Sequence, residues 1–393
     1  GHIRQRGSSW ELRLDLPRDP VTGARRTRTE TVRGSKRDAQ RRLRELLSAV
    51  DQGVVADAGK MTVGQWLARW LSEAVHGVSP KTHERYAEIV RKHLVPALGA
   101  IPLAKLAPAQ VQVYYAAALA GGRRDGRGGL APQTVRHHDR VLNVALKRAR
   151  SLRLITINPI EDVARPQVER QELEVLDAEE SSRLLAAAAT TRLHAPIVLA
   201  LATGMRRGEL LALRWSDVDL PGASLRVVQS LEQTVTGLRF KSPKTKRSQR
   251  AIALPQTAVE VLREHRVRQL EERLLLGLGK DDRALVFAQL TGEPFNPRNF
   301  SKEFARVVRR AGVRSVTFHG LRHTHITALL QAGVHPKVAS ERAGHSSITV
   351  TMDRYSHVVE GMQADAARRI DSALRQALGS NRVANQCPEP ATG

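Results

Sequence analysis

Apolar residues alternate with polar ones near the start of the chain, and the alternating positions are Trp10, Leu12, Leu14 and Leu16. A period of two predicts a strand, and a turn at 19–23 leads to a second predicted strand over 25–32. Apolar residues then recur at helical spacing over 36–49, which predicts a helix. The first sixty residues are therefore predicted to form a small sheet with one helix.

The next hundred residues have apolar positions every three or four residues, which predicts short helices. The predicted helices cover 62–71, the stretch from Pro80, 108–119 and 134–152. A glycine-rich basic loop at 121–129 precedes the last of them. Residues 158–174 contain two prolines and little periodicity, which is typical of a linker.

The remainder of the chain mixes helices with one strand region. Alternating apolar residues and a turn at Gly237 predict strands between 224 and 254. The helical pattern covers 181–202, 205–213, 257–276, 297–311, 320–331, 336–343, 349–355 and 362–378.

The predicted fold class is α+β with several domains. A small β-sheet plus helix forms residues 1–58, and a helical bundle forms residues 59–157. After the linker at 158–174, residues 175–380 form a mainly α domain with a small antiparallel β-sheet, and residues 381–393 a disordered tail.

Charge narrows the class of partner. The 393 residues include 63 basic and 39 acidic ones, a net charge of +24. The excess is spread as +6 over residues 1–60, +9 over 61–170 and +9 over 171–393. A detachable basic tail would concentrate the excess in one block, so several folded modules are each expected to face a polyanion. Arginine outnumbers lysine by 51 to 12, which genome composition could also explain.

Other features exclude whole classes of protein. Cys387 is the single cysteine, so an intrachain disulfide and a cysteine-based zinc site are impossible. No apolar run approaches the ~20 residues of a membrane helix, and no signal-peptide pattern begins the chain. We therefore expect a soluble, cytoplasmic protein without a membrane partner.

Four stretches carry candidate chemistry: 203–210 (TGMRRGEL), 243–245 (PKT), 318–324 (FHGLRHT) and 343–357 (AGHSSITVTMDRYSH). They contain arginines, a lysine, histidines and a tyrosine, but no phosphate-cradling GxxxxGK[ST] loop and no GxSxG elbow. Such a set suits a phosphodiester: a tyrosine oxygen can attack phosphorus while two guanidinium groups clamp the non-bridging oxygens. A lysine can protonate the departing oxygen and histidines can move protons, so neither metal nor cofactor is required.

This order of motifs resembles the tyrosine recombinases, the phage integrase family. The resemblance implies that Arg206 is the first catalytic arginine and that Glu209, one turn on, supports it. Lys244 matches the β-hairpin lysine of the family. Arg207 competes with Arg206 on charge alone, and Lys241 and Lys246 compete with Lys244, but the motif positions favour Arg206 and Lys244.

The same resemblance implies that His319 and Arg322 form the family's H-x-x-R pair, that His345 is the histidine of its G-H motif, and that Tyr355 is the nucleophile. His319 and His323 also have metal-ligand spacing. A zinc site usually adds an acidic base, and the intervening Arg322 would repel a dication, so no metal is expected.

The family's activity is expected with its fold: an arm-type DNA-binding domain, a SAM-like core-binding domain and a catalytic domain. The resemblance implies site-specific recombination through a 3′-phosphotyrosyl intermediate, by a homotetramer on double-stranded DNA with core and arm sites. A DNA-bending host factor and an excisionase are further implied partners, at the bacterial nucleoid. A type IB topoisomerase and a non-catalytic DNA-binding regulator are the alternatives, and the last predicted helix could dock in cis or in trans.

Overall fold

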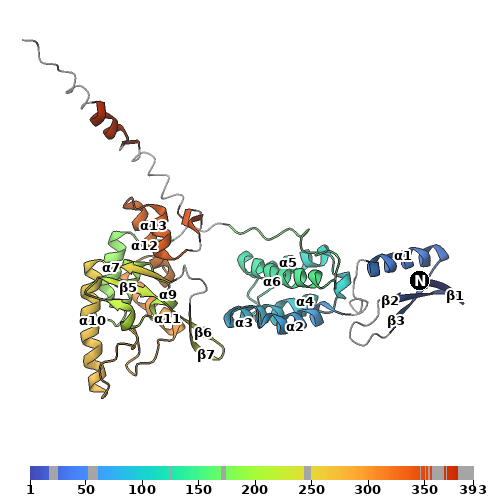
Figure 1. Ribbon diagram of the computed structural model, residues 1–393, viewed down its shortest axis with the longest axis horizontal. Helices are drawn as coiled ribbons and strands as arrows, with labels where there is room; N and C mark the ends of the chain where they lie inside the picture. Colours follow the sequence, from blue (N-terminus) through green and yellow to red (C-terminus); the bar gives the residue numbers. More distant parts are fainter. Residues whose placement is uncertain are drawn as a thin grey trace, which may run out of the picture. The chain divides into compact units, whose positions relative to one another are not determined.

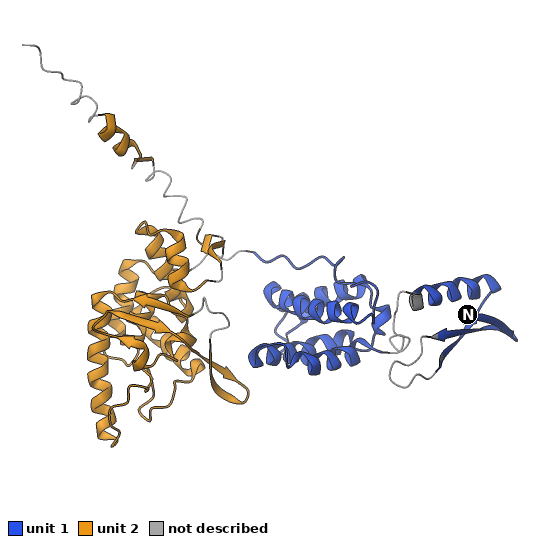
Figure 2. Cartoon of the chain, in the orientation of Figure 1, with its two compact units in different colours: residues 1–170 blue, residues 171–393 orange. Residues whose placement is uncertain are grey.

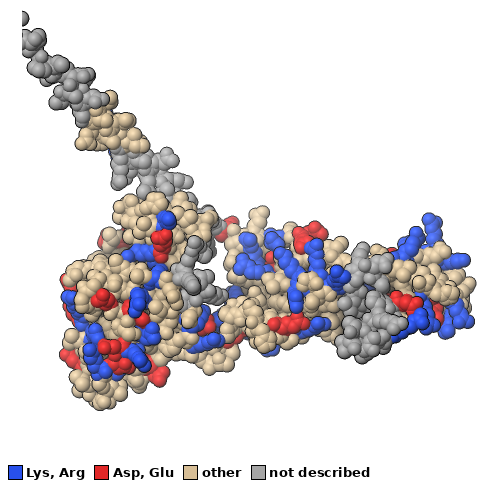
Figure 3. Space-filling view, in the orientation of Figure 1, with Lys and Arg blue, Asp and Glu red and all other residues tan. Residues whose placement is uncertain are grey.

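The computed structural model describes residues 1–16, 25–51, 61–123, 125–169, 174–242, 249–345, 347–349, 351–352, 355, 367–368 and 370–378. The chain divides into two compact units, residues 1–170 and residues 171–393 (Figure 2). Lys and Arg side chains lie on both units with Asp and Glu interspersed (Figure 3), as the spread of net charge predicts. No helix within the described ranges is long and apolar enough to cross a membrane.

Unit 1 begins with an antiparallel sheet and a helix (Figure 1). The elements are β1 (His2–Arg6), β2 (Ser9–Leu16), β3 (Arg26–Arg33) and α1 (Lys36–Asp51). The predicted alternation is confirmed where it is described, because Leu12 and Leu14 are buried against Ala39 and Leu46 of α1. β1 was not predicted, because Ile3 is the one apolar residue of its five. The predicted turn at 19–23 lies outside the described residues.

The rest of unit 1 is a helical bundle with a core of its own. Its elements are α2 (Val63–Ala74), α3 (Pro80–Ile89), the π-helix η2 (Val90–Leu94), α4 (Val95–Leu98), η3 (Leu103–Lys105), α5 (Pro108–Gly121) and α6 (Pro132–Ser151). Thr62 caps α2, since its hydroxyl accepts from the Gln65 amide and the Gln65 side chain accepts from the Thr62 N–H. Trp66, fully buried, donates from Nε1 to the Ala145 carbonyl at 3.0 Å and so joins α2 to α6.

The core of this bundle continues beyond α6 into the sequence predicted as a linker. Ile160 and Val163 are buried with the bundle residues. Asn158 donates to the Asn143 side chain at 2.9 Å, and Arg165 pairs with Asp139 at 3.2 Å. The first part of the 158–174 stretch therefore packs on the helical bundle.

Unit 2 combines helices with two small antiparallel sheets, of order β4-β5-β8 and β6-β7 (Figure 1). Its elements are α7 (Ala178–Ala188), α8 (His194–Thr203), α9 (Arg207–Leu210), η4 (Trp215–Asp217), β4 (Val218–Asp219), β5 (Ser224–Val227), β6 (Ser230–Thr234), β7 (Gly237–Lys241), β8 (Arg250–Ala253), α10 (Gln256–Leu275), α11 (Pro297–Ala311), α12 (Phe318–Gln331) and α13 (Pro336–Ala343). α12 packs against α8 and α13, and α11 packs against α7. The apolar residues of these elements form the main core of the unit.

The single helix predicted over 181–202 is wrong, because the structure has two helices there, α7 and α8. The Thr191 hydroxyl donates to the Ala188 carbonyl at 2.7 Å and accepts from the Leu193 amide at 3.2 Å. A threonine hydroxyl that bonds to nearby backbone groups competes with the backbone hydrogen bonds of a helix. Helix α7 therefore ends before Thr191. α9 is likewise shorter than the predicted helix over 205–213. Parts of the predicted helices at 349–355 and 362–378 lie outside the described residues.

Candidate active site

Arg206 stands at the N-terminus of α9, where two acceptors hold it. Its Nη1 donates to Oε1 of Glu209 at 2.8 Å, and its Nη2 donates to the Gly344 carbonyl at 2.8 Å. The Glu209 carboxylate also accepts from the backbone N–H of Arg206 at 3.0 Å, which satisfies a donor that α9 leaves free. The Arg206 side chain is 40% exposed. Its guanidinium is thus fixed on one side and open to a ligand on the other.

Gly204 ends α8 in the left-handed conformation, with φ of +64°. A Cβ atom at this position would lie 2.6 Å from Cδ2 of His325, and the Gly204 carbonyl accepts from Nη1 of Arg322 at 2.9 Å. The chain therefore needs glycine at the point where α8 ends and the stretch that carries Arg206 begins.

Gly204→Ala is expected to destabilise the protein by about 1–3 kcal/mol, from the left-handed backbone and the clash with His325. Chemical denaturation monitored by circular dichroism measures the change. Gly126→Ala is the control, at a position with φ of +68° and no atom within 4 Å of the added Cβ. It measures the loss of stability that comes from the left-handed backbone alone. A Gly204→Ala variant no less stable than Gly126→Ala would contradict the clash with His325.

Arg322 lies on α12 and is 2% exposed. Nη1 donates to the Gly204 carbonyl, whereas Nη2 is buried and has no hydrogen-bond partner in the part of the chain that the structure describes. Burial, reinforced by the positive charge of Arg206, lowers the pKa of Arg322 to about 9. A buried cation with an unused donor favours an anionic ligand, because the ligand would supply both the missing acceptor and the missing charge.

Tyr355 and two histidines of α12 form one aromatic group. Tyr355 is 0% exposed, and its hydroxyl shares a hydrogen bond of 2.6 Å with Nδ1 of His323. The rings of His319 and His323 meet edge to face, with centroids 4.9 Å apart. Sequence reasoning considered His323 only as a possible metal ligand and missed this contact. Its place next to Arg322 in the FHGLRHT stretch was the available signal.

His345 follows Gly344, which ends α13 in the left-handed conformation with φ of +67°. Nδ1 of His345 shares a hydrogen bond of 2.7 Å with the buried Thr351 hydroxyl, and its backbone N–H donates to the Ser340 carbonyl. The same turn therefore carries His345 and presents the Gly344 carbonyl to Arg206.

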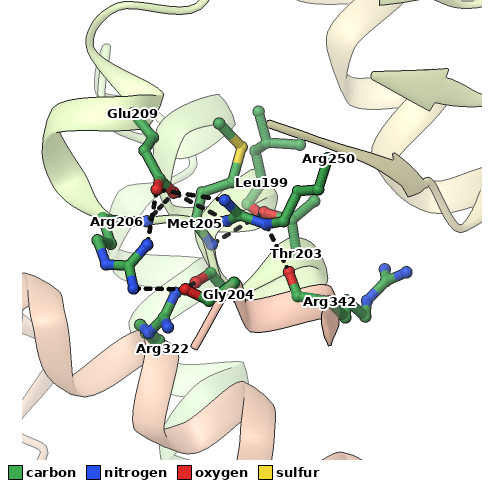
Figure 4. Close-up of polar contacts among 10 residues, drawn as sticks. Leu199, Thr203, Gly204, Met205, Arg206, Glu209, Arg250, Arg322 and Arg342 are labelled. Atoms are coloured by element: carbon green, nitrogen blue, oxygen red, sulfur yellow. Dashed lines mark hydrogen bonds and ion pairs between the residues drawn. The ribbon is translucent and has the colours of Figure 1, made fainter. Parts of the chain in front are cut away.

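A second layer of charged residues, Arg250 and Arg342, lies near Arg206 and Glu209 (Figure 4). Arg250 contacts both oxygens of Glu209, and Arg342 donates to the carbonyls of Ala202 and Ala253. The Glu209 carboxyl is buried, which raises its pKa, but hydrogen bonds and charges from Arg250 and Arg206 outweigh burial and hold the pKa below its ordinary value. This layer keeps one buried carboxylate ionised between two arginines.

His325 lies within the same layer. Its Nδ1 bonds to the Leu201 carbonyl at 2.7 Å, and Nε of Arg342 donates to its Nε2 at 3.3 Å. Burial and the Arg342 charge lower its pKa to about 4, so the ring is neutral at neutral pH. Sequence reasoning missed Arg250, Arg342 and His325 as site residues.

The competing residues have other contacts or are not described. Arg207 donates from Nη1 to the Ser301 hydroxyl of α11, and Lys241 pairs with Glu232 across the β6-β7 hairpin. Lys244 and Lys246 lie outside the described residues. Arg206, and not Arg207, is thus the arginine that contacts Glu209 and Gly344.

The structure brings most of the sequence-predicted residues together. The charges of Arg206 and Glu209 act on the ionisation of Arg322, and so would an ionised Tyr355. His319 joins Tyr355 through His323, and His345 adjoins the Gly344 carbonyl that Arg206 contacts. Within the described ranges, no group of three or more His, Cys, Asp or Glu residues is placed to hold a metal ion.

Comparison with known proteins points to one family throughout. Residues 174–361 match the phage integrase family, and residues 62–118 match the N-terminal SAM-like domain of phage integrases. An integrase of Streptomyces ambofaciens is 30% identical over 388 residues, which cover 95% of this chain and 96% of the relative. A tyrosine recombinase XerC-like protein of Caldanaerobacter subterraneus subsp. tengcongensis is 29% identical over 365 residues, which cover 88% and 91%.

Solved structures show the same fold. The Tn1549 transposon integrase in complex with a circular intermediate DNA aligns with a TM-score of 0.65 at 22% identity, covering 78% of this chain and 99% of that one. A lambda integrase dimer bound to a COC′ core site aligns with a TM-score of 0.56 at 21% identity, covering 75% and 95%. The chain belongs to the phage integrase family of tyrosine recombinases, enzymes that cleave and rejoin DNA.

Proposed function

We propose that this integrase performs site-specific recombination with Tyr355 as its nucleophile, to integrate or excise a mobile element. The Tyr355 oxygen attacks the scissile phosphorus and the bond from phosphorus to the 5′ oxygen breaks, which leaves a 3′-phosphotyrosyl link and a free 5′-hydroxyl. The hydroxyl of a partner strand then attacks phosphorus and releases tyrosine. The covalent link conserves the bond energy, so neither ATP nor another cofactor is needed.

Each remaining site residue has a proposed role in that step. Arg206 and Arg322 clamp the non-bridging oxygens and stabilise the charge of the pentacoordinate transition state. Lys244 protonates the departing 5′ oxygen, and His319 and His345 bind and move protons at the phosphate. Glu209 holds Arg206 in place.

The buried donor nitrogen of Arg322 is the observation that carries this proposal. Its Nη2 is buried without a hydrogen-bond partner among the described residues, and burial lowers its pKa. Among the described contacts, Arg206 and Arg250 both bind the one carboxylate of Glu209. A phosphate diester would supply negative charge beside these arginines and an acceptor for Nη2 of Arg322.

The proposed partners follow from the family and from the charge. Double-stranded DNA binds at core sites and at separate arm sites, four protomers act together on it, and a DNA-bending host factor and an excisionase control direction. The expected place of action is the nucleoid in a bacterial cytoplasm. Phosphate contacts dominate such binding, so affinity should fall steeply as salt rises.

A nicked suicide substrate that carries the cognate core site tests the proposal. Loss of the short fragment beside the nick prevents religation, so the wild-type protein should accumulate as a protein–DNA adduct that survives denaturing electrophoresis. The linked peptide, identified by mass spectrometry, should contain Tyr355. Binding without any adduct would favour the non-catalytic regulator.

A second assay separates the recombinase from a topoisomerase. A plasmid with two cognate sites should yield recombinant products. Relaxation of supercoils without strand exchange between the sites would instead support the type IB topoisomerase.

A further inference from the structure

Arg250 is a nearly buried arginine at the start of β8, and no motif in the sequence singles it out. Its side chain is 7% exposed. Nε donates to the Arg342 carbonyl at 2.8 Å, while Nη1 and Nη2 donate to Oε1 and Oε2 of Glu209 at 3.2 and 2.9 Å. The planar guanidinium therefore bridges the last turn of α13 and the carboxylate of α9.

The Glu209 carboxylate lies between two guanidinium groups. Oε1 accepts from Arg206 as well as from Arg250, and Oε2 accepts from the Arg206 backbone as well as from Arg250. Both oxygens are thus shared between the two arginines. Without Arg250, the carboxylate would keep, among these contacts, only its two bonds to Arg206 itself. No group outside Arg206 would then hold either oxygen, so the first acceptor of Arg206 would be less firmly oriented.

Arg250 also supports the second acceptor of Arg206. A Cβ atom at Gly344 would lie 2.8 Å from Nη1 of Arg250, so the glycine backbone packs directly on this guanidinium. The Arg342 carbonyl that Arg250 binds lies two residues before the Gly344 carbonyl that Arg206 binds. One buried side chain therefore contacts both structures that hold Arg206 (Figure 4).

We propose that Arg250 is a positioning residue for DNA cleavage, which acts on the scissile phosphate through Glu209, the Gly344 turn and finally Arg206. This inference rests on the proposed function. It assigns Arg250 no contact with DNA, since its three nitrogens are directed at protein acceptors. Its loss should therefore slow cleavage and leave DNA affinity unchanged.

A double-mutant cycle measures this coupling. Arg250→Gln and Arg206→Lys are prepared singly and together, and the single-turnover rate of adduct formation is measured on saturating suicide substrate. Arg250→Gln should lower the rate about 10- to 100-fold, as the loss of supporting partners does in other sites. In the Arg206→Lys background the same change should have little further effect, and Arg250→Lys should recover part of the rate.

Arg214→Gln is the matched control, because Arg214 makes a similar pair of bonds to the buried Asp217 of the same unit. It should cleave at the wild-type rate. Equal, additive losses from Arg250→Gln in both backgrounds, or wild-type cleavage by Arg250→Gln, would overturn the proposal.

A readout independent of cleavage keeps this inference distinct from the proposed function. Nitrogen-15 relaxation of the Arg206 Nε, assigned by comparison with Arg206→Lys, reports the mobility of the guanidinium. Arg250→Gln should increase that mobility. If the glutamine variant does not fold, the same measurement is made on Arg250→Lys. An unchanged Arg206 signal would overturn the positioning role whatever the activity, whereas the lack of a wild-type adduct would count against the proposed function alone.

Discussion

Replacing Tyr355 with phenylalanine should abolish the covalent protein–DNA adduct while leaving DNA binding intact. The substitution removes the attacking oxygen and keeps the ring that packs against Ile326 and Leu330. The loss of the hydrogen bond to His323 should cost about 0.5–1.5 kcal/mol of stability, which is small against the stability of a folded domain. Denaturing electrophoresis of the suicide-substrate reaction and a binding assay measure the two quantities side by side.

Tyr114→Phe is the control for this experiment. Tyr114 is also buried, and its hydroxyl also bonds to a histidine Nδ1, that of His138, at 2.7 Å. This variant loses a comparable contact in unit 1 and should still form the adduct. An adduct from the Tyr355→Phe protein would show that another residue is the nucleophile.

Arg322→Lys should reduce cleavage by at least about 10²–10³, the usual effect of losing one preorganised donor to a developing anion. Lysine keeps a positive charge but lacks the planar guanidinium, whose two Nη atoms could donate to the Gly204 carbonyl and to the phosphate at once. The rate of adduct formation on saturating DNA measures the loss. Arg214→Lys, away from the site, should retain the wild-type rate, and equal rates for Arg322→Lys and wild type would remove Arg322 from the mechanism.

Sequence reasoning proposed the site residues that lie within compact motifs. Arg206, Glu209, His319, Arg322, His345 and Tyr355 each belong to a short stretch whose spacing can be read along the chain. Helices α3 and α5 could also be predicted, because Pro80 and Pro108 mark their starts. Helix α6 begins at Pro132, two residues before its predicted start.

Residues that act through long-range contacts were missed. Arg250 lies at the end of the basic stretch KSPKTKRSQR, where one arginine cannot be told from its neighbours, and its partner Glu209 is 41 residues away. The break between α7 and α8 was missed because the Thr191 hydroxyl bond that ends α7 interrupts an otherwise helix-favouring alanine-rich pattern. Both outcomes depend on side-chain contacts that periodicity does not report.

The place of Tyr355 has a consequence for when the enzyme becomes reactive. Tyr355 is buried in a small core with Ile326, Leu330, Ala339 and Ala343, separate from the main core of the unit. Within the described residues this core is small, and a small core can open locally at a free-energy cost below that of global unfolding. The enzyme can thus keep the proposed nucleophile shielded from stray phosphates in the resting state. A sub-global fluctuation, which amide hydrogen exchange along α13 would detect, would expose it.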